Sequence, residues 1–401
     1  MSLNDTPTSE RVHIGIFGKR NAGKSSIMNG ITGQEIAIVS DIKGTTTDPV
    51  YKTMELLPLG PVVMIDTPGL DDDSELGNSR IKKSYQILNK TDIAIIVIDA
   101  FSGISKEDTE LIEIIKAKKI PYILVFNKAD LLEDASPATE NEIYVSTKNQ
   151  TNINELKEMI CSKYQAKESK LRIVGDLISP SDFIVLVVPI DKAAPKGRLI
   201  LPQQQTIRDI LDSDATAIVV KEYELKNTLA NLGKKPKLVI TDSQVFAKVS
   251  ADTPDDILLT SFSILFARYK GDLETVVKGA KVVDSLVDGD KILISEGCTH
   301  HRQCDDIGTV KLPRLITQYT GKQIQFNFSS GTEFPENISD YKMIVHCGGC
   351  MLNEREMKYR LACAKDANIP ITNYGILIAY LNGILKRSVK PFPYIYEMLD
   401  N

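Results

Sequence analysis

The fold of this chain is decided by the stretch HIGIFGKRNAGKSS, residues 13–26. It begins with an apolar run suited to a buried strand, residues 13–17, and leads into a stretch with helical periodicity. A glycine-rich turn between a strand and a helix presents successive backbone N–H groups at the helix N-terminus, where they can hold phosphate oxygens. The stretch therefore predicts a phosphate-binding loop, or P-loop, at the start of an α/β domain.

Five residues of this loop have an expected role in binding a nucleotide. Lys24 can reach the β- and γ-phosphates, and the Ser25 hydroxyl can bind Mg²⁺. Gly18 and Gly23 let the backbone approach the phosphates closely, and we count Ser26 among the nucleotide-binding residues. We therefore predict a site for a nucleoside triphosphate with its magnesium ion.

A second motif predicts how the terminal phosphate is handled. Asp66-Thr-Pro-Gly69 directly follows the apolar run 62–65. Asp66 can hold Mg²⁺ through a water molecule, and the Gly69 amide can contact the γ-phosphate. With Lys24, these two residues are predicted to serve hydrolysis.

A third motif predicts which base is bound. Asn127-Lys128-Ala-Asp130 follows another apolar run, and Ser146-Thr147 comes after a later one. The carboxylate of Asp130 can accept hydrogen bonds from N1–H and the exocyclic amine of guanine, whereas adenine presents a mismatched edge. We therefore predict GTP as the nucleotide, with these five residues around its base.

In this order and spacing, the motifs over residues 10–165 resemble those of the translation-factor-related GTPases, which include tRNA-modification and ribosome-assembly members. The resemblance implies that Thr46 binds Mg²⁺ and that Asn21 holds K⁺, although Asn21 could instead only bond the local backbone. Gly69 is followed by Leu70 instead of the water-orienting glutamine of Ras-like enzymes, so slow hydrolysis is expected.

Near the C-terminus, thiols and imidazoles predict a site for a soft metal. The motifs Cys298-Thr-His300 and His346-Cys347-Gly-Gly-Cys350 each follow a short apolar run. The carboxyl ends of strands in an open α/β sheet meet at one edge, so the two motifs can converge. Zinc bound by three cysteines and a histidine is one possibility.

We favour a 4Fe-4S cluster, because three thiolates would leave one iron with an exchangeable ligand. The predicted ligands are Cys298, Cys347 and Cys350. The candidates for the fourth position are Glu296, His300 and His346.

A GTPase combined with this cysteine and histidine pattern resembles the FeFe-hydrogenase maturation GTPases, the HydF family, over the whole chain. The family pattern is matched at Cys298, His300, His346, Cys347 and Cys350. The resemblance implies a scaffold that takes a transient di-iron precursor from two radical SAM maturases and delivers it to the apo-hydrogenase. It also implies a GTPase domain, a dimerisation domain and a cluster domain, and hence a homodimer.

The predicted fold class is α/β: a P-loop GTPase domain followed by two smaller α/β domains, the last carrying the metal cluster. A chain of 401 residues exceeds what one core usually supports. We expect the domains to cover residues 1–168, 169–264 and 265–401. In the last of these we also predict one continuous helix, Glu274–Val287.

Composition disfavours several other classes of protein. The formal charge is −5 without a sustained basic block, so nucleic acid is not an expected partner. No apolar run reaches the roughly 20 residues that span a bilayer, and the first residues are polar, so we expect no membrane association and a cytoplasmic location. Six cysteines without regular spacing are expected to be reduced.

Two other functions remain open at this point. One is a tRNA-modification or ribosome-assembly GTPase with a structural zinc site. The other is a cluster-bearing redox sensor that regulates its own GTPase.

Overall fold

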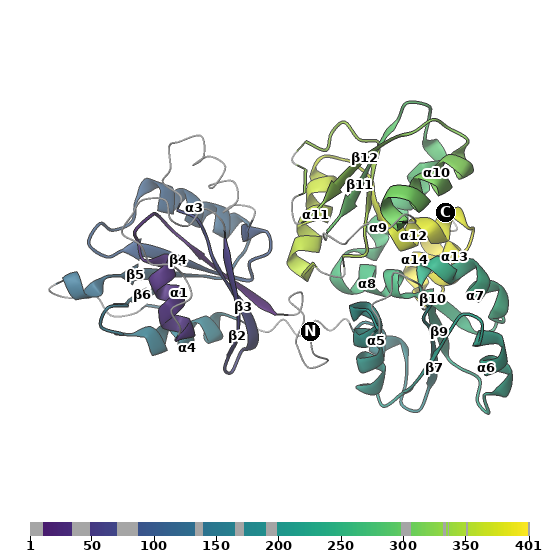
Figure 1. Ribbon diagram of the computed structural model, residues 1–401, viewed down its shortest axis with the longest axis horizontal. Coiled ribbons are helices and arrows are strands. Elements are labelled where there is room, and N and C mark those ends of the chain that lie inside the picture. The colour runs from purple at the N-terminus through teal and green to yellow at the C-terminus, as the bar shows by residue number, and fades with distance from the viewer. Residues whose placement is uncertain are drawn as a thin grey trace. The chain divides into compact units, whose positions relative to one another are not determined.

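The computed structural model divides the chain into two compact units, Met1–Glu168 and Ser169–Asn401. Each unit is an α/β structure with its own sheets (Figure 1). The structure describes residues 11–33, 49–69, 87–132, 139–164, 172–189, 199–297, 306–331, 334–335, 337–349 and 352–399.

The first unit is built on a six-stranded sheet with the order β2-β3-β1-β4-β5-β6. All neighbouring strands are parallel except β2 and β3, which are antiparallel. The strands are β1 (Val12–Phe17), β2 (Val50–Leu56), β3 (Gly60–Asp66), β4 (Ile93–Asp99), β5 (Tyr122–Asn127) and β6 (Glu142–Tyr144). The parallel order brings the carboxyl ends of β1, β3, β4 and β5 to one edge, where an open α/β sheet places its ligand.

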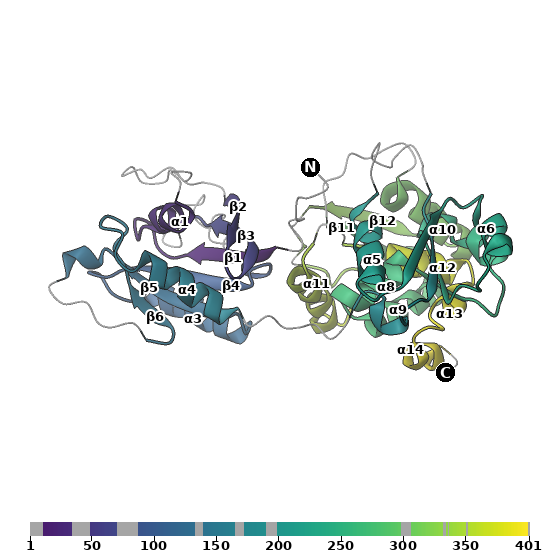
Figure 2. The same ribbon diagram turned by 90° about the horizontal axis from the view of Figure 1, so that it is seen from below.

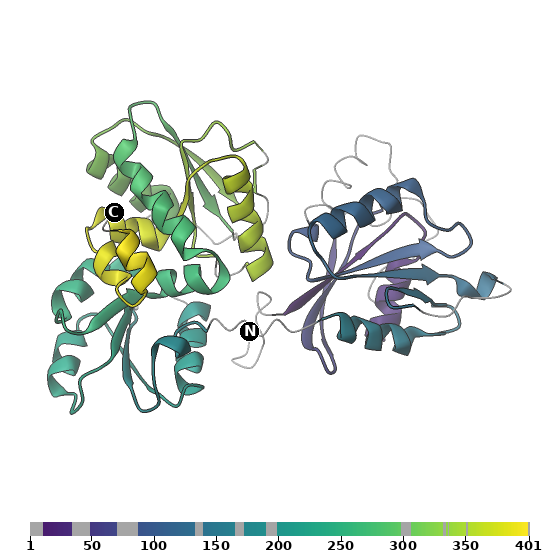
Figure 3. The ribbon, with the colours of Figure 1, turned by 180° about the vertical axis from the view of Figure 1, so that it is seen from behind.

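Helices cover both faces of this sheet and bury it. Apolar residues of α1 (Lys24–Thr32) and α4 (Ile153–Lys163) share one core with Ile14 and Ile16 of β1. Residues of α3 (Lys106–Ala117) share a separate core with Phe17. The helices α3 and α4 accordingly lie on opposite sides of the sheet (Figure 1, Figure 3). Burial on both faces explains why the central strands β1, β4 and β5 are almost wholly apolar.

The second unit contains two four-stranded sheets in which all paired strands are parallel. Their orders are β10-β9-β7-β8 and β12-β11-β13-β14. The strands of the first of these sheets are β7 (Phe183–Val187), β8 (Thr216–Val220), β9 (Leu238–Thr241) and β10 (Leu258–Ser261). Those of the second are β11 (Lys291–Glu296), β12 (Gln325–Ser330), β13 (Met343–His346) and β14 (Ile371–Asn373).

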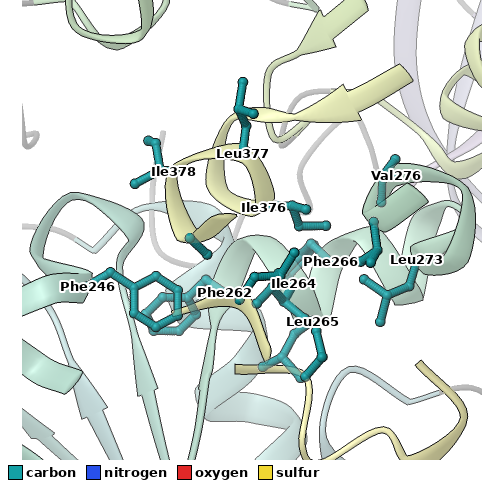
Figure 4. Packing of buried hydrophobic residues seen from close by; sticks show 14 of the residues in the cluster. Phe246, Phe262, Ile264, Leu265, Phe266, Leu273, Val276, Ile376, Leu377 and Ile378 are labelled. Carbon is teal, nitrogen blue, oxygen red and sulfur yellow. The ribbon is translucent and has the colours of Figure 1, made fainter. Parts of the chain in front are cut away.

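One continuous apolar core joins the two sheets of the second unit. The helices are α5 (Leu201–Leu211), α6 (Leu225–Asn231), α7 (Phe246–Asp252), α8 (Phe262–Lys270), α9 (Leu273–Lys281), α10 (Leu312–Thr320), α11 (Glu354–Asp366), α12 (Tyr374–Leu381), α13 (Leu385–Ser388) and α14 (Pro393–Met398). Figure 4 shows Phe262 and Leu265 of α8 packing near Ile376 of α12. Figure 2 shows α14 beside the C-terminus. The two smaller domains are thus packed into a single body.

The structure corrects one predicted element and leaves one boundary open. The helix predicted over Glu274–Val287 ends at Lys281, and a short 3-10 helix, Val282–Ser285, follows it. Val283 is fully buried there, while Asp284 and Ser285 are residues whose side chains compete for backbone hydrogen bonds. The domain boundary expected at 264–265 falls inside α8 and stays a prediction. In the described part of the chain, no helix has the length and apolarity needed to cross a bilayer.

Candidate functional site

The P-loop of the first unit joins β1 to α1, and two glycines hold its shape. Gly18 and Gly23 have φ angles of 137° and 95°, which glycine adopts without the strain of other residues. A Cβ on Gly18 would lie 2.2 Å from the carbonyl oxygen of Val97. One on Gly23 would lie 2.1 Å from Nδ2 of Asn127. The loop therefore needs glycine at both positions to pack against its neighbours.

Lys24, Ser25 and Asp66 meet at the N-terminal end of α1. Ser25 Oγ donates to Asp66 Oδ2 at 2.6 Å, and Lys24 Nζ donates to the carbonyl oxygens of Gly18 and Lys19 at 3.0 and 2.6 Å. Burial raises the pKa of Asp66, while the Ser25 hydrogen bond and the Lys24 charge oppose that rise. The Oδ1 atom of Asp66 is buried without a hydrogen-bond partner among the described residues. This oxygen and the serine hydroxyl are hard donors that fit Mg²⁺.

The residues predicted to read the base lie at the carboxyl end of β5, whose last residue is Asn127, and just beyond β6. Asn127 Nδ2 donates to the carbonyl oxygen of Ala22 at 3.1 Å, and Asn127 Oδ1 accepts from the Thr147 N–H at 3.4 Å. Ser146 Oγ donates to Asp130 Oδ1 at 2.6 Å. Asn127 therefore ties the P-loop to the base-recognition loop, and Ser146 orients the carboxylate of Asp130.

Lys128 is held in place by a carboxylate that sequence reasoning missed. Its Nζ lies 2.6 Å from Oδ2 of Asp99, the last residue of β4. Burial on its own would raise the pKa of Asp99, but hydrogen bonds from Lys128 and from the Phe101 N–H lower it overall. The sequence did offer a signal: Asp99 ends one apolar strand, and the next apolar strand along the chain leads into Lys128.

The structure gives the positions of some of the other residues predicted to bind the nucleotide. Asn21 is exposed with a φ angle of 58°, Ser26 lies half-buried in the first turn of α1, and Gly69 is half-buried after β3. Thr46 and Leu70 lie outside the described residues. Their roles stay predictions.

A second candidate site lies at the carboxyl ends of β11 and β13. The two strands pair in parallel with Ser295 opposite His346, so Glu296 and Cys347 come next at the same edge. The Cys347 N–H donates to the Ser295 carbonyl oxygen at 2.9 Å. The Gly297 N–H lies 3.1 Å from Cys347 Sγ, where it can donate to a thiolate. The sheet thus fixes both the backbone and the sulfur of Cys347.

His346 has both ring nitrogens engaged inside the protein. Nδ1 lies 2.6 Å from the carbonyl oxygen of Cys347, and Nε2 lies 3.0 Å from Nη1 of Arg360. In this arrangement neither nitrogen presents a lone pair to a metal. The geometry therefore gives no support to His346 as the fourth ligand. Nothing in the sequence singles out Arg360, which sits among other charged residues of α11.

Glu296, another candidate for the fourth position, is paired with a tyrosine. Tyr374 OH donates to Glu296 Oε1 at 3.3 Å. Burial, followed by the negative charges of Glu296 and Cys347, raises the pKa of Tyr374 well above its ordinary value. The phenol therefore keeps its proton and can orient the carboxylate. A Cβ on Gly308 would lie 2.3 Å from Tyr374 OH, so glycine makes room for this pair.

The two glycines after Cys347 differ in what the fold asks of them. Gly349 has a φ angle of 62°, and a Cβ there would lie 2.5 Å from Met357 Sδ. Gly348 is exposed, and a Cβ there would meet no atom of the described residues within 4 Å. Gly349 is thus required by the turn, whereas the space that the described residues leave beside Gly348 fits the approach of a bulky inorganic group held by thiolates.

The remaining predicted ligands, Cys298, His300 and Cys350, lie outside the described residues. Within the part of the chain that is described, no group of three or more histidine, cysteine, aspartate or glutamate side chains is placed to hold a metal ion. The donor chemistry of Cys347 and Glu296 fits the predicted cluster. The assembly of the full ligand set stays a prediction.

Three family profiles match the chain, one after another. Residues 13–128 match a profile described as 50S ribosome-binding GTPase. Residues 173–271 match the Hydrogen maturase F dimerization domain, and residues 274–391 match the Hydrogen maturase F tetramerization domain. The predicted fold class of a P-loop GTPase domain with two smaller α/β domains is confirmed, apart from the metal cluster.

Individual relatives match the GTPase portion. GTPase Der of Kosmotoga olearia is 36% identical over 145 residues, which are 34% of this chain and 33% of that protein. The tRNA modification GTPase MnmE of Desulforamulus reducens is 32% identical over 171 residues, 42% of this chain and 36% of that protein. The chain thus spans about a third of the length of the curated relatives it matches. Among solved structures, Era of Aquifex aeolicus is 20% identical with a TM-score of 0.35, covering 55% of this chain and 98% of its own, too distant a likeness to support a conclusion.

Proposed function

The chain belongs to the hydrogen maturase F family, and we propose that it is a GTP-hydrolysing scaffold that carries the di-iron precursor of the hydrogenase H-cluster. In this proposal it receives the precursor from two radical SAM maturases and transfers it to the apo-FeFe-hydrogenase. The dimerization and tetramerization domains support an oligomeric assembly, for which we propose a homodimer as the basic unit.

The nucleotide half of the proposal assigns roles to the P-loop unit. Lys24 holds the β- and γ-phosphates, the Gly69 amide contacts the γ-phosphate, and Asp130 selects guanine. Ser25 and Asp66 would hold Mg²⁺, which neutralises phosphate charge when bound. Two observations support that assignment: the hydrogen bond between these two side chains, and the buried Oδ1 atom of Asp66, which no described residue contacts by a hydrogen bond.

We expect hydrolysis to be slow and to respond to monovalent cations. Leu70 stands where a glutamine would orient the attacking water, so water is positioned less well. Asn21 is exposed at the P-loop, where its side chain can help to hold K⁺ near the phosphates. Thr46 is proposed as the second side-chain ligand of Mg²⁺ in the GTP state.

The carrier half of the proposal assigns a 4Fe-4S cluster to Cys298, Cys347 and Cys350. When bound, the cluster supplies an iron whose fourth ligand can be exchanged, and a di-iron precursor can attach there. Glu296 and His300 are the candidates we retain for that position, and Tyr374 would orient the Glu296 carboxylate. The observation that carries this half is the geometry around Cys347. Its backbone is held by Ser295 of β11 and its sulfur by the N–H of Gly297, and no described residue crowds the following Gly348.

The proposal is tested by transfer from the isolated protein. The chain is loaded in the presence of both maturases, repurified, and mixed with apo-hydrogenase that contains no maturase. We expect hydrogen evolution with the parent and none with Cys347→Ser, while Cys161→Ser in the first unit serves as a matched control. A parent that carries iron but never activates the apo-enzyme would remove the carrier role.

The second candidate, a GTPase for tRNA or ribosomes with structural zinc, rests on the names of the relatives of the first unit. It predicts a colourless, zinc-loaded protein after anaerobic purification and RNA binding that weakens steeply with salt. The carrier proposal predicts a brown, iron-loaded protein. Metal analysis therefore separates the two.

A further inference from the structure

The second unit buries an ion pair directly behind the Cys347 loop. Arg360 is 1% exposed, His346 is 2% exposed and Glu356 is 6% exposed. Burying an arginine and a carboxylate costs them their hydration, and apolar side chains in their place are often as stabilising or more so. Stability alone therefore does not explain why Arg360 lies here.

Arg360 joins three parts of the domain. Nη2 donates to Glu356 Oε1 at 2.9 Å on the same helix and to the carbonyl oxygen of Gly331 at 3.2 Å, just past β12. Nη1 points at His346 Nε2, 3.0 Å away. The guanidinium carbon also lies 5.4 Å from the ring centre of Phe334. These contacts fix the plane of the guanidinium.

The arginine decides which nitrogen of His346 carries the proton. A guanidinium has only donors and stays protonated, so Nε2 must accept the hydrogen bond from Nη1. The proton of the neutral ring is then on Nδ1, which donates to the carbonyl oxygen of Cys347 at 2.6 Å. In a trans peptide the carbonyl and the following N–H point in opposite directions, so the Gly348 N–H is directed away from His346.

We propose that Glu356, Arg360 and His346 form a positioning relay that fixes the Cys347–Gly348 peptide in the orientation required by the metal-binding loop. His346 then acts behind the loop instead of serving as a ligand, as hydrogen-bonded groups behind metal ligands commonly do. The proposal deepens the proposed function and rests on it for the metal, whereas the relay itself belongs to the metal-free chain.

A small cavity beside the relay supports a positioning role for His346 instead of a role as a metal ligand. It is lined by Lys270, His346, Cys347 and Arg360 among others and has a volume of about 20 Å³. Such a space holds about one water molecule. This cavity is too small for a di-iron group, which fits a positioning role for the side chains that line it.

The relay is tested first on the metal-free full-length chain by nitrogen NMR of its four histidines. We expect His346, assigned by the loss of its signal in His346→Asn, to be protonated at Nδ1 and unprotonated at Nε2. The double variant Arg360→Met/Glu356→Leu removes both charges together, so neither is left buried alone. We expect this variant to melt within about 5 °C of the parent and to lose the single tautomer.

Two matched variants then test the effect on the cluster by electron paramagnetic resonance after anaerobic reconstitution. His346→Asn keeps a donor near the position of Nδ1, whereas His346→Gln keeps an acceptor near the position of Nε2. We expect His346→Asn to retain the iron content and the spectrum of the parent. The same result is expected when His346→Asn is combined with Arg360→Met and Glu356→Leu in one chain. We expect His346→Gln, like the double variant alone, to give altered and broadened spectra.

Other outcomes overturn the relay. A parent protonated at Nε2, or an unchanged His346 signal in the double variant, would contradict it in the metal-free chain. Equal loss of iron from His346→Asn and His346→Gln would make His346 a ligand and remove its positioning role. If the parent shows the expected tautomer but binds no cluster, the proposed function fails while the relay stands.

Discussion

The nucleotide site and the Cys347 site are both built at the carboxyl ends of parallel strands, but they draw on the chain in different ways. The nucleotide site takes its residues from short motifs, each contained within one loop after one strand. The Cys347 site depends on partners that lie far apart in the chain, such as Gly297, Glu296 and Arg360. Local motifs therefore identify the first site, whereas the residues that surround Cys347 in the second site are known only from tertiary contacts.

The difference also concerns where rigidity comes from. At the nucleotide site, Asn127 ties two loops together through side-chain hydrogen bonds. At the Cys347 site, backbone hydrogen bonds to Ser295 and from Gly297 fix the residue before any metal is considered. We infer that substitutions at the first site act on chemistry, while those at the second act on the geometry of a loop.

Lys24→Ala should have the largest effect. Without the ammonium, charge on the phosphates is no longer stabilised, and we expect kcat/KM for GTP to fall by about 10²–10³-fold. Release of phosphate under multiple turnover measures this. Lys106→Ala on α3 is the control, because the Lys106 side chain is 87% exposed and its ion pair with Glu110 is 3.9 Å long. A loss below tenfold would show that hydrolysis does not depend on this loop.

Asp130→Asn should change the base that is accepted. The carboxylate takes charge-assisted hydrogen bonds from guanine, so its loss should weaken GTP binding by roughly 10–100-fold. The amide instead matches xanthine, whose 2-carbonyl can accept from it. Titration with both triphosphates checks the exchange of preference. Unchanged preference for GTP would mean that Asp130 does not read the base.

Gly349→Ala should lower the stability of the fold, whereas Gly348→Ala should lower the binding of iron. Gly349→Ala forces a side chain into a left-handed conformation against Met357, and we expect it to cost about 1–2 kcal/mol of unfolding free energy. Gly348→Ala should leave stability within about 0.5 kcal/mol but lower the iron content after reconstitution. Thermal melts and iron analysis of both variants test this. Equal losses of stability would contradict the distinction between the two glycines.

Replacing K⁺ by Na⁺ should have the smallest effect. A single cation in a largely hydrated place contributes on the order of 1 kcal/mol, so we expect hydrolysis to slow roughly fivefold. Asn21→Ala should abolish the difference between the two ions. If the variant keeps full K⁺ stimulation, Asn21 only shapes the loop.

Sequence reasoning succeeded where the physical signal is local. The strands β1, β4 and β5 are apolar because both faces of the sheet are covered, so they stand out as runs. The edge strand β2 was missed, because Lys52 and Glu55 interrupt its apolar residues and leave no continuous apolar run.

The relay behind the Cys347 loop could not be predicted from the sequence. The helix α11 reads as a charged surface helix, and its sequence gives Arg360 no distinction from Arg355 or Lys358. Only the fold places Arg360 against His346. The pattern of cysteines and histidines predicts a metal site but not which of its residues face the metal.

The proposed carrier function depends most on a cluster held by three cysteines from two parts of the chain. The direct measurement is anaerobic reconstitution of the parent, Cys298→Ala, Cys347→Ala and Cys350→Ala, with iron and sulfide analysis and electron paramagnetic resonance of the reduced proteins. We predict about four irons and four sulfides per parent chain and loss of the four-iron signal in each variant. Retention of that signal in all three variants would contradict the account.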